Sequence, residues 1–313
     1  MKVTLVIPCY NEEANIDKMY AAIEEAFIGK DMELELVYVN DGSRDQTLQK
    51  LRALLSKTDF QIKIVDFSRN FGKEAAIYAG LQQSTGDYTA LIDGDLQQPP
   101  ALVGEMVAFL EENPDYDCVA AYQDTRNEGT TLKFFKNMFY RVINKMTDIH
   151  FVNDAGDFRT FRRNMLETIL SMSEGDRFTK GIFAWVGFRT HFIPYVAAKR
   201  AGGVSKWSFR KLFKYATGGI MSFSTAPLSV AKYAGALSLL ASVLAPYFCP
   251  VLRKYDRVLL FSVLFVGGLN LIAMSILGSY VGKIFMESKK RPIYVARAVL
   301  SNEQKAEGDD QKQ

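Results

Sequence analysis

Short apolar runs alternate with longer amphipathic stretches over about the first 125 residues of the chain. Strand-length runs rich in Val, Ile, Leu and Tyr occupy residues 3–7, 34–39, 62–67, 88–92 and 117–121. Helix-length patterns occupy residues 12–27, 45–56, 73–83 and 99–112. Strands that alternate with helices are typical of βαβ units, so the pattern predicts an α/β fold with a mainly parallel sheet. Ligands of such sheets bind beyond the carboxyl ends of the strands.

The middle of the chain has a weaker pattern. Apolar residues recur at helical spacing over 131–146, and residues 162–172 predict a further helix. The stretch 206–225 mixes basic and aromatic side chains, among them Trp207 and Phe213. This mixture favours an amphipathic helix at a membrane interface. An ordinary surface helix with one core-facing side would have a similar pattern, and the sequence leaves that alternative open.

Two stretches near the C-terminus have the length and composition of membrane spans. Residues 233–252 and 258–282 contain no charged side chain, and a span needs about 20 apolar residues. The link at 253–257 is short, so we expect the two spans to form a helical hairpin. The first span contains Pro246 and Pro250, which predict a kink or a short helix.

Basic residues flank both apolar stretches, and this distribution predicts the topology. They are Lys199, Arg200, Lys206, Arg210, Lys211 and Lys214 before the first stretch, and Lys283, Lys289, Lys290 and Arg291 after the second. Positive flanks lie on the cytoplasmic side. The link also carries three basic residues, which is a mild conflict. The chain begins with a strand rather than a leader. We therefore expect a multi-pass protein of the cytoplasmic (inner) membrane, with the α/β domain on the cytoplasmic side.

The expected domain organisation follows from these segments. Residues 1–205 form the cytosolic domain and 206–228 the amphipathic juxtamembrane segment. Residues 229–285 form the transmembrane hairpin and 286–313 a cytosolic tail, which is polar after Leu300.

Composition excludes several classes of function. Hydrophobic residues make up 48% of the chain, which is enough for a sizeable core. The net charge is only +3, which gives no reason to expect a nucleic-acid partner. Three well-separated cysteines and two histidines supply little material for a disulfide framework, a zinc site or a Ser-His-Asp triad.

Polar motifs follow the predicted strands directly. They are PCYNE at 8–12, NDGS at 40–43, SRNFGK at 68–73 and DGDLQ at 93–97. Two carboxylates one residue apart, Asp93 and Asp95, can hold Mg²⁺ or Mn²⁺ against a nucleotide diphosphate. The metal would stabilise the charge that develops as a sugar–phosphate bond breaks. Asp is also common in turns, so this pair is a weak signal when it stands alone.

Two other residues in these motifs admit two readings each. Asp41 is placed at a strand end to hydrogen-bond a base or ribose, and its motif could equally form only a turn and helix cap. Lys73 could reach the diphosphate, or could simply begin a helix.

Taken together, the motifs at 8–12, 40–43 and 93–95 resemble those of the family 2 glycosyltransferases. SRNFGKEA at 68–75, DGDLQQP at 93–99, GDFR at 156–159 and GVSKW at 203–207 narrow the likeness to polyprenyl-phosphate glycosyltransferases. These include dolichol-phosphate mannose synthases and bacterial undecaprenyl-phosphate (bactoprenol) glucosyltransferases. The resemblance covers about residues 1–295. It implies a nucleotide-sugar-binding, Rossmann-like domain of the GT-A type with a C-terminal two-helix transmembrane hairpin.

The resemblance also implies roles for individual residues. Those expected in the nucleotide-sugar pocket are Pro8, Tyr10, Glu12 and Asp41. Lys73 is a further candidate there on its charge and position alone, not on the resemblance. Those expected around the metal are Asp93, Asp95 and Gln97, and Asp93 also contacts the donor. Asp157 matches the family's proposed catalytic aspartate. Those expected to meet the acceptor phosphate are Arg200, Ser205 and Lys206, and Arg126 is a further candidate because arginine suits phosphate.

The chemistry of a phosphate acceptor leaves the role of Asp157 open. A phosphomonoester has a second pKa of about 6, so its oxygen needs little deprotonation at neutral pH. Asp157 could therefore act as a general base, orient the acceptor and stabilise charge at the anomeric carbon, or be structural.

The sequence thus predicts a metal-dependent enzyme that transfers a hexose or N-acetylhexosamine, with inversion, from a UDP-linked donor to undecaprenyl phosphate. The product would serve modification of a cell-surface polymer such as the cell wall. Gly267, Gly268, Gly278 and Gly282 would allow close helix packing in a homo-oligomer. A processive polysaccharide synthase is the first alternative, but the chain lacks its Gln-x-x-Arg-Trp motif. A non-catalytic lipid-binding scaffold is the second.

Overall fold

The structure of the chain is a computed structural model. It describes residues 1–58, 60–123, 155–172, 174–196, 231, 233–238, 240 and 255–302. The predicted helix at 131–146, the juxtamembrane segment 206–228 and most of the first predicted span lie outside the described residues.

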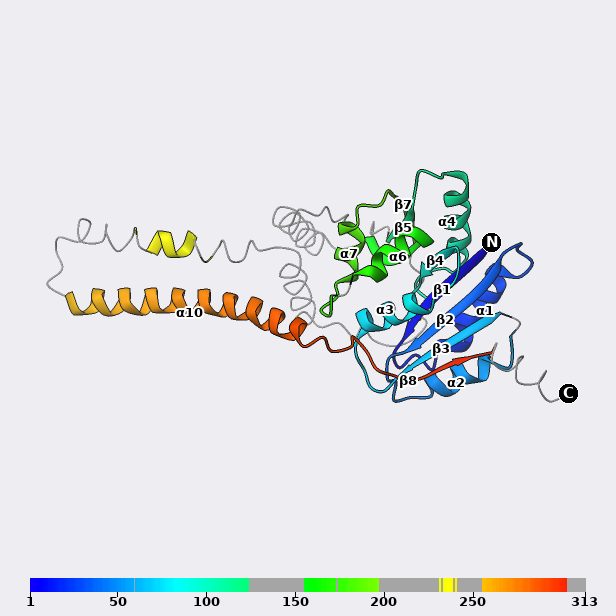
Figure 1. The fold of residues 1–313 in the computed structure, drawn as a ribbon, viewed down its shortest axis with the longest axis horizontal. Helices are drawn as coiled ribbons and strands as arrows, with labels where there is room; N and C mark the ends of the chain where they lie inside the picture. Colours follow the sequence, from blue (N-terminus) through cyan, green and yellow to red (C-terminus); the bar gives the residue numbers. More distant parts are fainter. Residues whose placement is uncertain are drawn as a thin grey trace. The chain divides into compact units, whose positions relative to one another are not determined.

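An eight-stranded sheet forms the framework of the α/β unit, with strand order β7-β5-β6-β4-β1-β2-β3-β8 (Figure 1). The strands are β1 (Lys2–Cys9), β2 (Glu33–Asn40), β3 (Gln61–Phe67), β4 (Tyr88–Leu91), β5 (Cys118–Gln123), β6 (Ala155–Arg162), β7 (Thr190–Tyr195) and β8 (Ala296–Ser301). Strands β1 to β4 pair in parallel, as the alternation of strands and helices predicts. The five strands expected from the sequence are confirmed, and β6, β7 and β8 were not expected.

Helices cover the sheet and bury its apolar side chains. They are α1 (Ile16–Phe27), α2 (Thr47–Leu54), α3 (Lys73–Gln83), α4 (Ala101–Glu112), α6 (Arg163–Ser171) and α7 (Thr179–Trp185). The buried residues of α1, Ile16, Met19, Ile23 and Phe27, recur every three or four positions, which is the spacing of one helix face.

Strand β1 is buried on both of its faces. Val3, Leu5 and Ile7 belong to one core cluster with side chains of α1 and α4. The alternate residue Val6 meets α3, where a Cβ added to Gly80 would lie 2.2 Å from the Val6 Cγ1 atom. The absence of a side chain at Gly80 lets α3 approach the strand closely. Burial on both faces explains why the run at 3–7 is continuously apolar rather than alternating.

Antiparallel β6 decides where the second half of the site lies. It pairs with β4 in the register Leu91↔Arg159 and Tyr88↔Arg162. The beginning of β6 therefore meets the carboxyl end of β4. Because of this direction, Asp157 comes to the same edge of the sheet as the loop after β4, although 60 or more residues separate them in sequence.

Helix α10 (Tyr255–Ser288) belongs to a second compact unit. Its segment Phe265–Ser288 is long and apolar enough to cross a membrane. The mean hydropathy of its apolar stretch is 1.5, and no residue of that stretch is buried. Large apolar side chains such as Leu271 and Met274 are about 70% exposed. The helix begins inside the predicted link and extends beyond the predicted end at residue 282. This is the one candidate span in the part of the chain that the structure describes, so the predicted two-span hairpin stays a prediction.

The segment after α10 returns to the sheet. The sequence predicts only a cytosolic tail at 286–313, without a strand in it. Strand β8 pairs antiparallel with β3 and forms an edge of the sheet (Figure 1). The Asn302 side chain accepts a hydrogen bond from Ile62 N at 2.9 Å and donates one to Phe60 O at 2.8 Å. The Tyr294 ring stacks on Phe67 at 4.8 Å between centroids. These contacts make residues 294–302 an integral part of the α/β unit.

Candidate active site

Three charged side chains meet at the carboxyl ends of β4 and its neighbours. The Lys73 Nζ atom, at the first residue of α3, lies 2.7 Å from Asp93 Oδ1 and 2.8 Å from Asp157 Oδ2. Asp93 lies in the loop after β4, and Asp157 lies in β6. One ammonium therefore bridges two carboxylates from separate elements. Two of these residues were predicted as donor-binding and one as catalytic, and the structure brings all three together.

The ion pairs determine the charge state of this cluster. Burial by itself raises the pKa of Asp157, but the ammonium of Lys73, helped by that of Lys180, outweighs burial and holds this pKa well below its usual range. Burial alone would lower the pKa of Lys73, but the charges of Asp157 and Asp93 raise it. The Asp157 Oδ1 atom is buried and has no hydrogen-bond partner among the described residues. Asp157 is thus an ionised carboxylate with one oxygen that can still accept a hydrogen bond.

Gln98 fixes the position of Asp93, and the sequence analysis did not single it out. Its Oε1 atom accepts a hydrogen bond from Asp93 N at 2.8 Å, and its Nε2 atom donates to Asp93 Oδ2 at 3.1 Å. Gln98 is buried. The predicted metal neighbour Gln97 donates its backbone N–H to Asp95 Oδ1 at 3.1 Å. The two glutamines therefore hold the two aspartates of the loop in different ways.

The loop fits a divalent metal that substrate would help to bind. Over the part of the chain that the structure describes, no cluster of three or more His, Cys, Asp or Glu residues is arranged to hold a metal ion. Mg²⁺, however, is commonly bound by one or two carboxylates together with substrate phosphates. Asp93 and Asp95 supply such a pair at a strand end, and their oxygens are the ligands that hard cations prefer. A substrate diphosphate would complete the set.

A cavity of about 300 Å³ lies at the carboxyl ends of β1, β2 and β3. Its lining includes Tyr10, Asn40, Gly42, Ser43, Asp66 and, from β8, Arg297. Gly42 has a φ of +62°, and a Cβ there would lie 2.4 Å from the backbone of Arg69. A glycine is therefore required at this position, because the NDGS turn passes directly over the loop that follows β3.

The predicted pocket residue Asp41 holds that loop. Its Oδ1 atom accepts hydrogen bonds from Phe71 N at 2.7 Å and Gly72 N at 3.2 Å, and its Oδ2 atom accepts one from the Asn70 side chain at 2.8 Å. Burial raises the pKa of Asp41, and the backbone hydrogen bonds oppose that shift. Since Lys73 follows this loop directly, Asp41 also positions the ammonium that bridges Asp93 and Asp157.

The remaining predicted residues divide into two groups. Pro8 lies in β1, Tyr10 lines the cavity, and Glu12 accepts a hydrogen bond from Asn15 Nδ2 at 2.6 Å. The acceptor residues Arg126, Arg200, Ser205 and Lys206 lie outside the described residues. Arg159 of the GDFR motif is buried, and its guanidinium lies 3.8 Å from the Phe183 ring centre.

Tyr195 is a further residue near the site that the sequence analysis missed. Burial raises its pKa, and the charges of Asp93 and Asp95 raise it further. Its ring meets Phe158 edge-on at 5.6 Å. Its only sequence signal was an aromatic residue in a short apolar run, which is typical of many strands.

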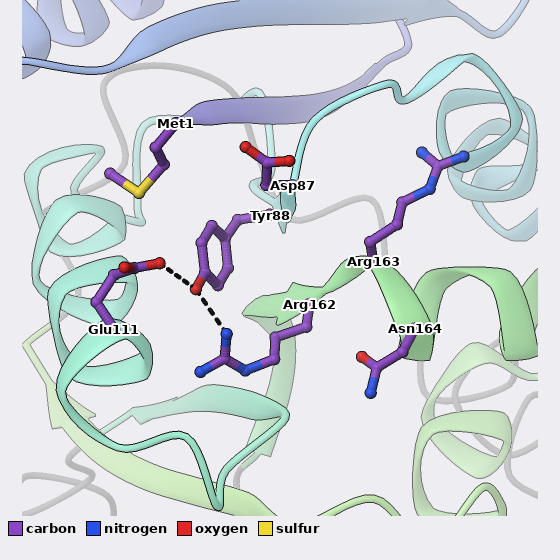
Figure 2. A pocket seen from close by; sticks show the side chains of 7 residues that line it. All are labelled: Met1, Asp87, Tyr88, Glu111, Arg162, Arg163 and Asn164. Atoms are coloured by element: carbon purple, nitrogen blue, oxygen red, sulfur yellow. Dashed lines mark hydrogen bonds between the residues drawn. The ribbon is translucent and has the colours of Figure 1, made fainter.

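A second cavity, of about 340 Å³, lies at the other ends of β4 and β6 (Figure 2). There the Tyr88 hydroxyl donates to Glu111 and accepts from Arg162 NH1 at 2.7 Å. The Arg162 Nε atom donates to Tyr116 O at 3.0 Å, and its NH2 atom donates to Leu110 O. These polar groups are committed to one another, so this cluster joins β4, β6 and α4 rather than offering a site.

Comparison with known proteins agrees with this geometry. The sequence profile of the family Glycosyl transferase family 2 matches residues 4–170. A prophage bactoprenol glucosyl transferase homolog of Escherichia coli (strain K12) is 37% identical, over 96% of this chain and 99% of that protein. The bactoprenol glucosyl transferase of Shigella phage SfV is 37% identical, over 95% and 98%.

Among solved structures, S. aureus TarS 1-349 in complex with UDP-GlcNAc superposes with a TM-score of 0.50. It is 16% identical and covers 90% of this chain and 81% of that one, so this likeness concerns the fold. The profile match and the near full-length relatives decide the family. The chain belongs to glycosyl transferase family 2.

Proposed function

We propose that this protein transfers a hexose or N-acetylhexosamine from a UDP-linked donor to undecaprenyl phosphate, with inversion, to make a lipid-linked sugar for modification of a cell-surface polymer. The observation that carries the proposal is the likeness, along almost the whole chain, to relatives named bactoprenol glucosyl transferases. A shared fold alone would support a glycosyltransferase but would leave the acceptor undetermined.

The donor would lie along the edge of the sheet. Its nucleoside would occupy the cavity at the ends of β1 to β3, and its diphosphate would approach Asp93, Asp95 and Lys73. When bound, Mg²⁺ or Mn²⁺ would neutralise charge on the leaving diphosphate. Lys73 supplies a second positive charge at the same place, and its side chain is 41% exposed and thus accessible to a phosphate.

The acceptor phosphate oxygen would attack the anomeric carbon directly. The new carbon–oxygen bond forms as the bond to the diphosphate breaks, and the leaving electron pair goes to the diphosphate oxygen. A single displacement of this kind inverts the configuration at the anomeric carbon.

Asp157 then acts best by charge rather than by taking a proton. A general base works best with a pKa near the operating pH, whereas Lys73 holds the pKa of Asp157 well below its usual range. The acceptor phosphate is mostly ionised at neutral pH and needs no base. A fixed negative charge would stabilise the positive charge that develops at the anomeric carbon. Of the three roles considered for Asp157, we propose this electrostatic and orienting one.

The membrane arrangement is part of the proposal. Helix α10 supplies one candidate span, and we propose that residues 233–252 supply the other, with both flanks cytoplasmic. Such a multi-pass anchor in the inner membrane would hold the α/β unit at the surface where the lipid phosphate lies. The basic residues Arg126, Arg200 and Lys206, with Ser205, would bind that phosphate. The glycines of α10 would allow association with a second copy.

A transfer assay tests the proposal. Detergent-purified protein receives undecaprenyl phosphate, Mg²⁺ or Mn²⁺, and each of several radiolabelled nucleotide-sugars, and label in the lipid phase is measured. We expect label from one donor, lost when metal is chelated and in the Asp95→Ala variant. Label in long water-soluble chains would instead indicate a processive synthase. No label from any donor, beside an active control enzyme in the same detergent, would contradict the proposal.

A further inference from the structure

Helix α7 is fixed to the beginning of α3, next to the ion-paired cluster of the site. The carboxylate of Glu74 accepts hydrogen bonds from Thr179 N at 2.8 Å and from the Thr179 hydroxyl. The guanidinium of Arg177, in the loop before α7, lies 4.4 Å from the ring centre of Tyr78 in α3. Since Glu74 directly follows Lys73, the start of α7 lies beside the ammonium that bridges the two carboxylates.

Further along, α7 packs on β6 and brings a second lysine toward Asp157. The Phe183 ring of α7 covers the guanidinium of Arg159, which follows Asp157 by two residues in β6. Lys180 precedes Phe183 by almost one helical turn, and so lies nearer to the start of α7. Burial raises the pKa of Asp157, and the charges of Lys73 and Lys180 lower it, which agrees with this placement. The side chain of Arg159 is buried, whereas that of Lys180 is partly exposed.

The strand order determines where the two reactants would lie along this edge of the sheet. The proposed nucleoside cavity lies at β1 to β3, and the proposed diphosphate site follows β4. Strand β6 is the next strand beyond β4, on the side away from β1, so the sugar would extend toward β6. A direct displacement requires the acceptor to attack from the side opposite to the leaving diphosphate. The acceptor phosphate would therefore approach from β6 and α7, where Lys180 lies.

We propose that Lys180 binds the phosphate of the lipid acceptor as it approaches the anomeric carbon. An ionised phosphate and the carboxylate of Asp157 would repel each other at close range, so a cation is needed beside them. Lys73 already forms ion pairs with two carboxylates. An ammonium has three donors and binds phosphate as a compact point charge, which suits a partly exposed lysine. This inference rests on the proposed function, since it presupposes a phosphate acceptor.

Steady-state kinetics of the detergent-purified full chain test the inference, with undecaprenyl phosphate and the nucleotide-sugar that the wild-type protein uses. Lys180→Met and Lys180→Gln both remove the charge. We expect the KM for undecaprenyl phosphate to rise about tenfold or more, which is the usual loss for one hydrogen bond to a charged group. The kcat should change much less, because the contact is made before as well as during transfer. Lys180→Arg keeps the charge and should stay within about threefold of the wild-type KM.

The same charge could instead serve the donor diphosphate, and UDP binding distinguishes these two phosphate sources. The dissociation constant of UDP with Mg²⁺ is measured calorimetrically, and we expect the same value for wild type and Lys180→Met. The matched control is Lys50→Met. Lys50 forms an ion pair with Asp17 at 2.5 Å, between α2 and α1 rather than at α3 or α7. The control should keep the acceptor KM and the UDP dissociation constant. Melting temperatures show whether each variant is folded.

The outcomes distinguish this inference from the proposed function. If the wild-type protein transfers sugar but both neutral variants keep its acceptor KM, the inference is overturned and the proposed function stands. A UDP dissociation constant that rises as much as the acceptor KM would assign Lys180 to the donor and overturn the inference. A lower kcat with an unchanged acceptor KM would also overturn it, because Lys180 would then act only through the charge of Asp157.

If the wild-type protein transfers no sugar to undecaprenyl phosphate, the inference and the proposed function are both overturned. The supporting result is a raised acceptor KM in Lys180→Met and Lys180→Gln that is restored in Lys180→Arg and absent in Lys50→Met.

Discussion

Strands β4 and β6 carry a polar cluster at each of their ends, and the two clusters are built on opposite principles. At one end Tyr88, Arg162 and Glu111 are joined by hydrogen bonds (Figure 2). At the other end Lys73 bridges Asp93 and Asp157, and Asp157 keeps a buried oxygen unpaired within the described part of the chain. The cluster whose polar groups are hydrogen-bonded to one another stabilises the sheet. The cluster with the unpaired Asp157 oxygen can still accept a hydrogen bond from a ligand.

The largest effect is expected for Asp157→Asn. The change removes the negative charge that we propose stabilises the anomeric carbon, and we expect the transfer rate to fall by about 10²- to 10³-fold. Stability should also fall, because the ion pair between Asp157 and Lys73 is lost and leaves the ammonium with one fewer carboxylate partner. Initial rates and melting temperature measure the two effects. A rate within about threefold of wild type would show that the charge has no catalytic role.

Lys73→Met tests the bridge between the carboxylates. We expect about 10²-fold slower transfer, since the methionine offers no charge to the diphosphate. The free energy of unfolding should fall by about 1–3 kcal/mol, less than for a wholly buried pair because Lys73 is partly exposed. Activity and denaturant unfolding measure these effects. Lys180→Met is a useful comparison, because Lys180 lowers the pKa of Asp157 without belonging to the bridge.

The same variant should change how stability depends on pH. The pKa of Asp157 is lowered in the folded state from an ordinary value of 3.8, so its contribution is present above about pH 4 and is lost as the pH falls toward the folded-state pKa. Without Lys73 the lowering of this pKa is smaller, so the stability of the variant should fall less than that of the wild type as the pH drops below about 4. Unfolding free energies between pH 3 and 7 check this. Parallel pH profiles for wild type and variant would contradict the ion-pair account.

Gln98→Leu should have a smaller effect. Two hydrogen bonds to Asp93 are lost, so the loop that we propose to bind the metal is held less well, and we expect kcat/KM for the donor to fall about tenfold. The effect should appear as a higher metal requirement, measured by titrating Mg²⁺. Gln97→Leu is the matched variant, because Gln97 contacts Asp95 through its backbone N–H. An equal effect of both would indicate that the side chain of Gln97 also matters.

The smallest effect on the transfer rate is expected at the cluster of Tyr88, Glu111 and Arg162. Tyr88→Phe removes a hydroxyl that links Glu111 and Arg162, and we expect a loss of about 1–3 kcal/mol in unfolding free energy. The transfer rate per folded molecule should stay unchanged, because this cluster lies at the far end of β4. Urea unfolding and initial rates measure the two quantities. A large loss of rate with stability preserved would show that the two ends are coupled.

The local sequence predicted the parallel half of the molecule well. Strands such as Lys2–Cys9 and helices such as Lys73–Gln83 agree with the predicted runs within a few residues. Their apolar periodicity is set by neighbours in sequence, which is why it is visible without a structure. Asp93 and Lys73 were identified from motifs that follow predicted strands, because strand ends in such folds carry the ligand-binding groups, whereas Asp157 was identified only from the resemblance of its GDFR motif to the family.

Other features depend on partners distant in sequence. The segment at 296–301 was expected only as part of the cytosolic tail at 286–313, and it becomes strand β8 because the edge of β3 offers it a partner. The contacts of Gln98 and Asp66 likewise follow from which polar groups surround them in the fold. No local pattern contains this information.

The sequence alone determined that this chain forms an α/β sheet with charged residues at the strand ends and a long apolar segment after it, because hydrophobic periodicity and motif spacing are local properties. Only the tertiary structure decided which charges meet. It placed Lys73 between Asp93 and Asp157, and it brought Arg297 beside Asp66 across more than 200 residues of chain. Strand pairing and side-chain packing decide such meetings, and both depend on contacts that exist only once the chain has folded.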